Sequence, residues 1–242
     1  MKMTKPLLLT ILSLFVFDAS AMAISSLMLT NPETKAGVFT LDNTDEITYF
    51  LKTSVSKVEI VDNKIIKTPY TRDNLDSWDI ATKPSKLVIE PNMVKEIQVE
   101  SICGERCDTD KDQVYQINIQ PVSYSTEGKQ QSKINMLFGF SPYYIVPAKV
   151  SNVEYLLDYK GDTITAKNSG NTMIDIVIDQ CDKDGVIDED DDRALCKANF
   201  TILAGRTRDV HVPEVLQADE LEVMVLNHDE SYREEIRLSR GE

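Results

Sequence analysis

The strongest alternation of apolar and polar side chains lies between Ser132 and Lys149. Every second position there carries a large apolar group, while the intervening positions are mostly small or polar. Side chains in a β-strand point to opposite faces with a period of two, so one face would be apolar along its length. The pattern fits a core strand of a β-sandwich and also a strand that offers its apolar row to another chain through an open edge. The row consists of Ile134, Met136, Phe138 and Phe140.

Short apolar segments between turn residues fill the rest of the chain. Their spacing of roughly 8–12 residues is typical of β-sandwiches, and no segment sustains a helical period. The one amphipathic candidate, 215–226, is better explained as a loop followed by a strand. We therefore predict an all-β fold. The expected strands include 39–41, 47–51, 97–102 and 114–120 before the row, and 153–159, 173–178, 221–225 and 236–238 after it.

The N-terminus has the pattern of an export signal. Lys2 and Lys5 precede an apolar run, 7–17, that is too short to cross a bilayer. Small-x-small cleavage patterns end at Ala21 and at Ala23, and we expect cleavage after Ala23. The sequence thus predicts a signal peptide over residues 1–23.

The remainder has a length that suits two β-domains. The apolar run ends at Pro147, and a new series of strand segments begins a few residues later. We place an N-terminal domain at 24–148 and a C-terminal domain at 149–242, each near the size at which a sandwich core is stable. The short junction predicts a fixed or hinged angle with a cleft between the domains.

Composition excludes some classes of partner. The chain has a formal net charge of −14, with 26 basic and 40 acidic residues. Such a surface repels nucleic acid and anionic membranes, so we expect neither a nucleic-acid partner nor membrane insertion.

Four cysteines follow the export signal. In an oxidising compartment an even number indicates disulfides, and four cysteines allow three connectivities. Proximity in the sequence favours Cys103–Cys107 and Cys181–Cys196. A four-thiolate zinc site is the competing interpretation, but the spacings fit it poorly and export argues against it.

Catalytic patterns are missing from the sequence. The only histidines, His211 and His228, have no nucleophile motif near them, and no phosphate-binding or metalloprotease motif occurs. We predict no catalytic residues, no cofactor and no bound metal.

Residues 180–191 partly follow a calcium-binding loop, with Gly185 at the sixth position, but Gln180 and Asp191 depart from its ends. An acidic hairpin tip is the preferred interpretation, and calcium binding stays an alternative.

Several segments resemble the periplasmic pilus-assembly chaperones of the PapD-like family, most closely the class 5 (CFA/I- and CS1-type, alternate chaperone–usher) branch. The resemblance covers essentially the whole chain after the signal. It rests on D-E-I-T-Y-F-L-K at 45–52, K-P-S-K-L-V-I-E-P-N at 83–92, D-Q-V-Y-Q-I-N-I-Q-P-V at 112–122, K-I-N-M-L-F-G-F-S-P-Y-Y-I-V-P at 133–147 and K-N-S-G-N at 167–171, together with Cys181 and Cys196.

The resemblance implies two immunoglobulin-like domains in a boomerang arrangement and a chaperone of the chaperone–usher pathway. Such a chaperone lends its donor strand to a pilus or fimbrial subunit that lacks one, and passes the subunit to an outer-membrane usher in fimbrium biogenesis. The donor row would be Ile134, Met136, Phe138 and Phe140, with a register uncertain by one residue at Leu137.

The family also binds the subunit's C-terminal carboxylate with two basic residues. Lys35 lies in the similar place for the first. The second is usually a lysine shortly before the terminal proline of the donor strand, where this chain has none, so Lys133 and Lys149, which bracket the strand, are the candidates. A self-capping dimer of the free protein is a further expectation. The alternative hypothesis is a secreted structural pilus subunit or adhesin module.

Overall fold

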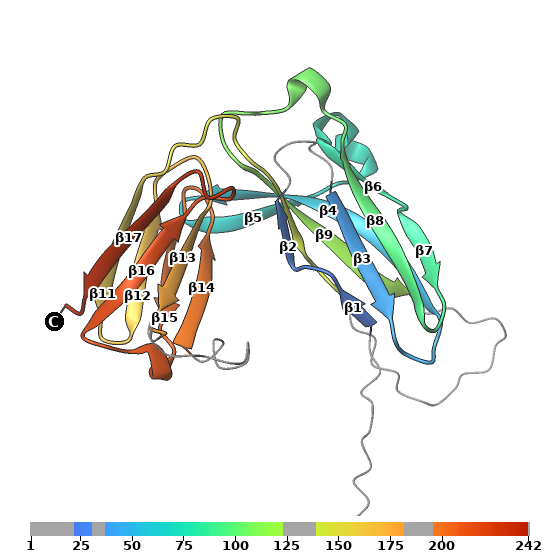
Figure 1. Ribbon diagram of the computed structural model, residues 1–242. Coiled ribbons are helices and arrows are strands. Elements are labelled where there is room, and N and C mark those ends of the chain that lie inside the picture. The colour runs from blue at the N-terminus through green and yellow to red at the C-terminus, as the bar shows by residue number, and fades with distance from the viewer. Residues whose placement is uncertain (1–21, 31–36, 123–138, 182–195, 242) are drawn as a thin grey trace, which may run out of the picture.

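The computed structural model describes residues 22–30, 37–122, 139–181 and 196–241, and Figure 1 shows two β-sandwich domains that meet at an angle. The prediction of an all-β chain with two sandwich domains is therefore confirmed. Within the described ranges the helical elements are three short 3₁₀ turns: η1 (Arg72–Ser77), η2 (Gly104–Arg106) and η3 (Glu214–Leu216).

Two sheets form the N-terminal domain. The first has the order β1-β3-β8-β6, and the second has the order β2-β10-β9-β4-β5, with β7 paired to another part of β4. All pairs are antiparallel except β2 with β10, which is parallel. The first sheet contains β1 (Met22–Ile24), β3 (Gly37–Asn43), β8 (Met93–Ser101) and β6 (Ile80–Lys83); the second contains β2 (Met28–Thr30), β10 (Tyr143–Val146), β9 (Gln113–Val122), β4 (Tyr49–Val61), β5 (Lys64–Pro69) and β7 (Lys86–Ile89).

The period-two pattern of these strands builds the domain core. In β3, Phe39 and Leu41 are fully buried while Val38 and Asp42 are exposed. They belong to a cluster that also takes in Leu51, Ile117 and Ile119 from the opposite sheet. The two inner faces thus interdigitate as in other aligned sandwiches.

The C-terminal domain has a three-stranded sheet, β11-β12-β15, and a four-stranded sheet, β14-β13-β16-β17. Its core cluster includes Ile164, Ile176, Val210 and Leu221. The segment 215–226 forms the short turn η3 and then β16, as the sequence pattern predicts. The strands are β11 (Tyr155–Lys160), β12 (Thr163–Asn168), β15 (Thr207–His211), β14 (Lys197–Ile202), β13 (Ile174–Asp179), β16 (Glu220–Leu226) and β17 (Arg233–Ser239).

A third apolar cluster joins the two domains. Val58 of β4, Val114 of β9 and Ile145 of β10 pack there against Met173 of the C-terminal domain. This contact explains why Tyr143–Val146 is an unbroken apolar run: Tyr144 faces the N-terminal core, whereas Ile145 faces the other domain. It also explains why the alternation after 47–51 loosens although β4 continues to Val61. The buried face of β4 changes, from the side of Leu51 and Val55 in the N-terminal core to the side of Val58 in the interdomain cluster.

Candidate functional site

Phe140 is the one residue of the apolar row that lies within the described ranges, and it pairs with β9. Its amide donates to the Ile119 oxygen at 2.9 Å, and the Ile119 amide donates to the Phe140 oxygen at 2.8 Å. The Phe140 side chain is half-buried and packs against the N-terminal core cluster. The chain is thus strand-like at Phe140, three residues before β10 begins.

The outer side of this segment is an open sheet edge. Both backbone groups of Phe140 point to β9, so in an antiparallel pair those of Gly139 and Ser141 belong to the outer side. Of these groups, the Ser141 oxygen also accepts a long hydrogen bond, 3.4 Å, from the Gln116 side chain of β9. The neighbouring β2 pairs only with residues 143–145. No described strand pairs with the outer side of 139–141. Backbone groups on such an edge can accept a strand from another chain.

A surface hollow of about 370 Å³ lies beside this edge, lined by Gln120, Pro121, Gly139, Phe140 and Ser141. Gly139 permits the close approach of the segment to β9, because a Cβ there would lie 2.7 Å from the Ile119 oxygen. The hollow therefore lies over the end of β9 and the segment that pairs with it.

Most of the predicted binding residues lie outside the described residues. This holds for Ile134, Met136 and Phe138 of the row and for the basic residues Lys35 and Lys133, so their roles stay predictions. Lys149 is described: its side chain is exposed, and its amide donates to the Thr109 oxygen at 2.9 Å. It lies in the linker after β10.

One exposed lysine that the sequence did not single out lies on the N-terminal sheet near the domain junction. Lys67 of β5 places its Nζ 5.9 Å from the centre of the Tyr143 ring on β10. Tyr143 packs against the interdomain cluster, so this ammonium group lies on the sheet face that turns toward the C-terminal domain. Among the described residues Lys67 makes no ion pair. β5 and β10 are not neighbours, since β4 and β9 lie between them, and the two side chains approach each other across the same face of the sheet. No local sequence pattern encodes this approach.

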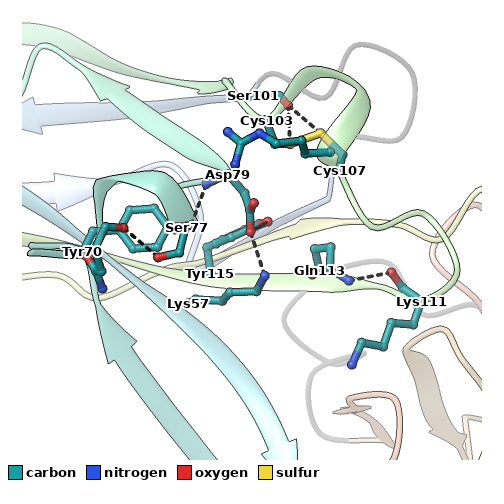
Figure 2. Close-up of polar contacts among 12 residues, drawn as sticks. Lys57, Tyr70, Ser77, Asp79, Ser101, Cys103, Cys107, Lys111, Gln113 and Tyr115 are labelled. Atoms are coloured by element: carbon teal, nitrogen blue, oxygen red, sulfur yellow. Dashed lines mark hydrogen bonds and ion pairs between the residues drawn. A yellow bond between two sulfur atoms is a disulfide. The ribbon is translucent and has the colours of Figure 1, made fainter.

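Lys57, by contrast, is engaged in a polar network within the N-terminal domain. Figure 2 shows Asp79 between the Lys57 side chain and the loop of the Cys103–Cys107 disulfide. An Asp79 carboxylate oxygen lies 2.7 Å from Lys57 Nζ and accepts a hydrogen bond from the Tyr115 hydroxyl at 3.3 Å. Burial raises the pKa of Tyr115, and the nearby Asp79 charge adds to the rise. Lys57 therefore stabilises the fold and has no free charge to offer a ligand.

The same network holds the Cys103–Cys107 loop in place. The amides of Ile102 and Cys103 donate to the Asp79 backbone oxygen at 2.8 and 3.2 Å. Ser101 Oγ lies 3.4 Å from both sulfur atoms of the disulfide (Figure 2). This loop, for which the family resemblance offers no counterpart, thus caps the end of β8 next to Asp79.

The joint between the domains centres on a buried carboxylate, Asp112, at the start of β9. One oxygen accepts the Ala148 amide of the linker at 2.9 Å, and the other accepts the Met173 amide at 2.7 Å and the Thr172 hydroxyl at 3.3 Å. Burial raises the pKa of Asp112, and these hydrogen bonds oppose the rise, as does nearby His228. One side chain therefore links β9, the linker and the C-terminal domain.

The K-N-S-G-N segment, 167–171, forms the C-terminal half of the joint. Asn171 Nδ2 donates to the Asp110 and Val150 oxygens at 2.6 and 2.9 Å. Buried Asn168 donates to the Thr172 and Ile202 oxygens and holds the turn. A glycine is required at 170, since a Cβ there would lie 2.3 Å from the Asn152 oxygen.

Both expected disulfides, Cys103–Cys107 and Cys181–Cys196, are present. Of the calcium-loop candidate 180–191, all but Gln180 and Cys181 lie outside the described residues. In the described part of the chain no three His, Cys, Asp or Glu side chains are grouped so that they could hold a metal ion. Nor does any helix of that part have the length and apolar character needed to span a membrane.

Comparison with known proteins connects this architecture to fimbriae. The family described as the CS5 fimbrial protein N-terminal domain matches residues 24–147, just over half of the chain. No curated protein matches the chain by sequence.

Solved structures share the two-domain fold at low sequence identity. The class 5 fimbriae chaperone CfaA has a TM-score of 0.54 and 12% identity, covering 92% of this chain and 100% of its own. The periplasmic chaperone SfaE has a TM-score of 0.54 and 9% identity, covering 90% and 100%. A chain from the Salmonella enterica SafA pilin–SafB chaperone complex has a TM-score of 0.54 and 10% identity, covering 92% and 98%.

Proposed function

The chain belongs to the CS5 fimbrial protein N-terminal domain family, and from this premise we propose that it is an assembly chaperone for pilus or fimbrial subunits. It binds a subunit by lending it a β-strand, without catalysis and without a cofactor. The similar solved structures include two fimbrial or periplasmic chaperones and one chaperone in complex with a pilin, which supports a subunit as the partner.

The observation that carries the proposal is the open edge at Gly139–Ser141. It lies where the apolar row leads into β10, next to a hollow of about 370 Å³. A subunit groove laid against this edge gains main-chain hydrogen bonds from the edge and side-chain burial from the row.

The binding free energy of such a complex can be estimated from the apolar side chains of the row that become buried. Phe140 already packs against the chaperone's own core, so most of the gain comes from Ile134, Met136 and Phe138. Burying three large apolar side chains contributes roughly 5–9 kcal/mol gross. Association costs of several kcal/mol reduce this, which leaves a complex that is stable and still releasable to an usher.

A basic residue that can bind the subunit's C-terminal carboxylate is part of the proposal. Lys67 joins the sequence candidates Lys35, Lys133 and Lys149, because its exposed ammonium lies beside β10 with no described ion-pair partner. It compensates for the missing lysine near the end of the donor strand. A lysine suits this role as a compact, mobile positive charge.

We place the protein in the periplasm after signal-peptide removal. Strand β1 begins at Met22 and pairs with β3 through Met22 and Asn43. Cleavage after Ala21 would keep β1 whole, whereas the cleavage we expected after Ala23 would remove two of its three residues. Because it keeps β1 whole, cleavage after Ala21 is the pattern that we adopt in this proposal.

The decisive experiment is a pull-down of the tagged protein from the periplasm of its native cell, with mass spectrometry of the proteins bound. We expect one or a few small secreted β-proteins at about 1:1, lost in Phe138→Glu. The matched control is Val38→Glu, which places the same charge at a 43% exposed position of the other sheet and should keep binding.

Other outcomes of this experiment would contradict the proposed chaperone function. If Phe138→Glu unfolds the protein, the row is a core strand and the donor-strand proposal is wrong. Recovery of the folded protein alone in every form supports a structural pilus subunit or adhesin module instead.

A second pair of variants tests the role of Lys67. Lys67→Gln should weaken subunit binding more than Lys64→Gln, which changes an exposed lysine on the same strand.

A further inference from the structure

The C-terminal domain has an open side between two edge strands, β11 and β17. Each strand ends its own sheet, and Figure 1 shows the pair on the flank that lies away from the N-terminal domain. They are joined at one end, where the Gly241 amide donates to the Tyr159 oxygen at 2.7 Å in a parallel bridge. Toward the start of β11 a groove of about 470 Å³ separates them.

The floor of this groove is apolar. Tyr155, Leu157, Ile236 and Leu238 line it and are half-buried against the domain core. Leu156 on its rim is 65% exposed. Alternating apolar positions on two unpaired strand edges are what an added strand recognises through its main chain and alternate side chains.

An acidic group stands at an inward position of the groove, where the neighbouring positions of β17 are apolar. The hydroxyls of Tyr155 and Tyr232 both donate to the same Glu234 oxygen, Oε2. Their rings meet edge to face with centres 6.4 Å apart. These two hydrogen bonds lower the pKa of Glu234, so its carboxylate is ionised at neutral pH. Its second oxygen, Oε1, has no partner among the described residues.

The charge of the groove has one sign. Glu154 and Glu234 line it, and no lysine or arginine does. The arginines of β17, Arg233 and Arg237, face away and pair with Glu235 and Glu222. A carboxylate framed by two tyrosine rings favours a cation, through a charge-assisted hydrogen bond and the ring faces.

We propose that the groove between β11 and β17 binds an extended segment of a partner protein that places a lysine or arginine between apolar side chains. The cation reaches Glu234 Oε1, the apolar neighbours lie on the groove floor, and the backbone pairs with an edge strand. The groove is separate from the edge at Gly139–Ser141, so the segment can bind while a subunit occupies the N-terminal domain. The proposal does not depend on the chaperone assignment.

The test uses the full-length mature protein and a capped peptide, Ser-Val-Ser-Lys-Ser-Leu-Ser, in which Val, Lys and Leu share one face. Calorimetric titration should show saturable binding, about tenfold weaker or more with Glu in place of Lys, because one charge-assisted hydrogen bond is lost. Glu234→Gln should weaken the Lys peptide by a similar factor. Glu235→Gln, the matched control on the opposite face, should bind it normally.

Thermal unfolding of each variant accompanies the titration. If Glu234→Gln does not fold, Leu156→Lys at the exposed rim takes its place and should repel the Lys peptide to a similar extent. Equal binding of the Lys and Glu peptides, or no binding of either to the wild type, overturns the proposal. Glu234 would then serve only to connect β11 and β17 through its hydrogen bond from Tyr155.

Discussion

Replacing Asp112 with asparagine tests the joint between the domains. The substitution keeps the size of the side chain but turns one of two acceptor oxygens into a donor. The Ala148 and Met173 amides lie 2.9 and 2.7 Å from different oxygens, so one of them loses its acceptor. Asp112 is only 7% exposed, and water cannot easily replace the lost partner.

The magnitude follows from two opposing effects. A buried amide left without an acceptor costs about 1–3 kcal/mol, and hydrogen bonds to a charged group contribute about 1.5–3 kcal/mol. Removing the charge returns part of its desolvation cost, the cause that raises the pKa of Asp112. We therefore expect the free energy of unfolding to fall by about 2 kcal/mol, or roughly 4–8 °C in melting temperature for a chain of this size.

Scanning calorimetry measures this change, and small-angle scattering should show a broader distribution of domain angles in Asp112→Asn. Asp110→Asn is the matched control: it removes the same charge two residues away, at an exposed side chain, and should change stability by less than about 0.5 kcal/mol. If Asp112→Asn melts with the wild type and scatters identically, the carboxylate does not hold the joint.

The pH dependence gives a second readout of the same residue. A raised pKa means that the folded state holds the Asp112 proton more tightly than the unfolded state. The contribution of Asp112 to stability is therefore greatest at low pH and declines as pH rises through the folded pKa. The stability difference between wild type and Asp112→Asn should accordingly widen as pH falls from about 7 toward about 4. A constant difference across this range would contradict the inference that the carboxyl is buried.

Three further changes test the framework around the sites. Gly170→Ala forces a Cβ to within 2.3 Å of a backbone oxygen in the neighbouring loop and should cost about 1–3 kcal/mol in urea unfolding; a neutral effect would mean that this turn is not tightly packed. Lys57→Met leaves the largely buried Asp79 carboxylate without its cation and should cost about 1–3 kcal/mol, whereas an unchanged midpoint would place that carboxylate in contact with water. Replacing the Cys181–Cys196 pair by serines should lower the free energy of unfolding by about 3 kcal/mol, and replacing Cys103–Cys107 should lower it by about 2 kcal/mol. The first disulfide closes the longer loop, since the sequence separations are 15 and 4. A larger loss for Cys103–Cys107 would show that local packing outweighs chain entropy.

The strand content and the two-sandwich fold were determined by the sequence itself. Alternation at Phe39–Leu41 or Leu221–Val225 reports a buried and an exposed face, since neighbouring side chains in a strand point in opposite directions. The disulfide pairs could be read from short sequence separations. The donor row from Ile134 to Phe138 also came from alternation, and it stays a prediction because those residues lie outside the described ranges.

Only the tertiary structure decided the features that join distant segments. Asp112 binds the Met173 amide, and Lys67 lies near the Tyr143 ring. Tyr155 donates to Glu234, as Tyr232 does from the same strand region. In the pairs Asp112–Met173, Lys67–Tyr143 and Tyr155–Glu234 the two residues are more than 60 positions apart in the sequence. Local periodicity specifies which way a side chain points from its own strand. It does not specify strand order, register or the angle between domains, which are set by the packing of whole faces. For that reason the sequence predicted the strands of this protein, and the fold alone revealed its joint and its two open edges.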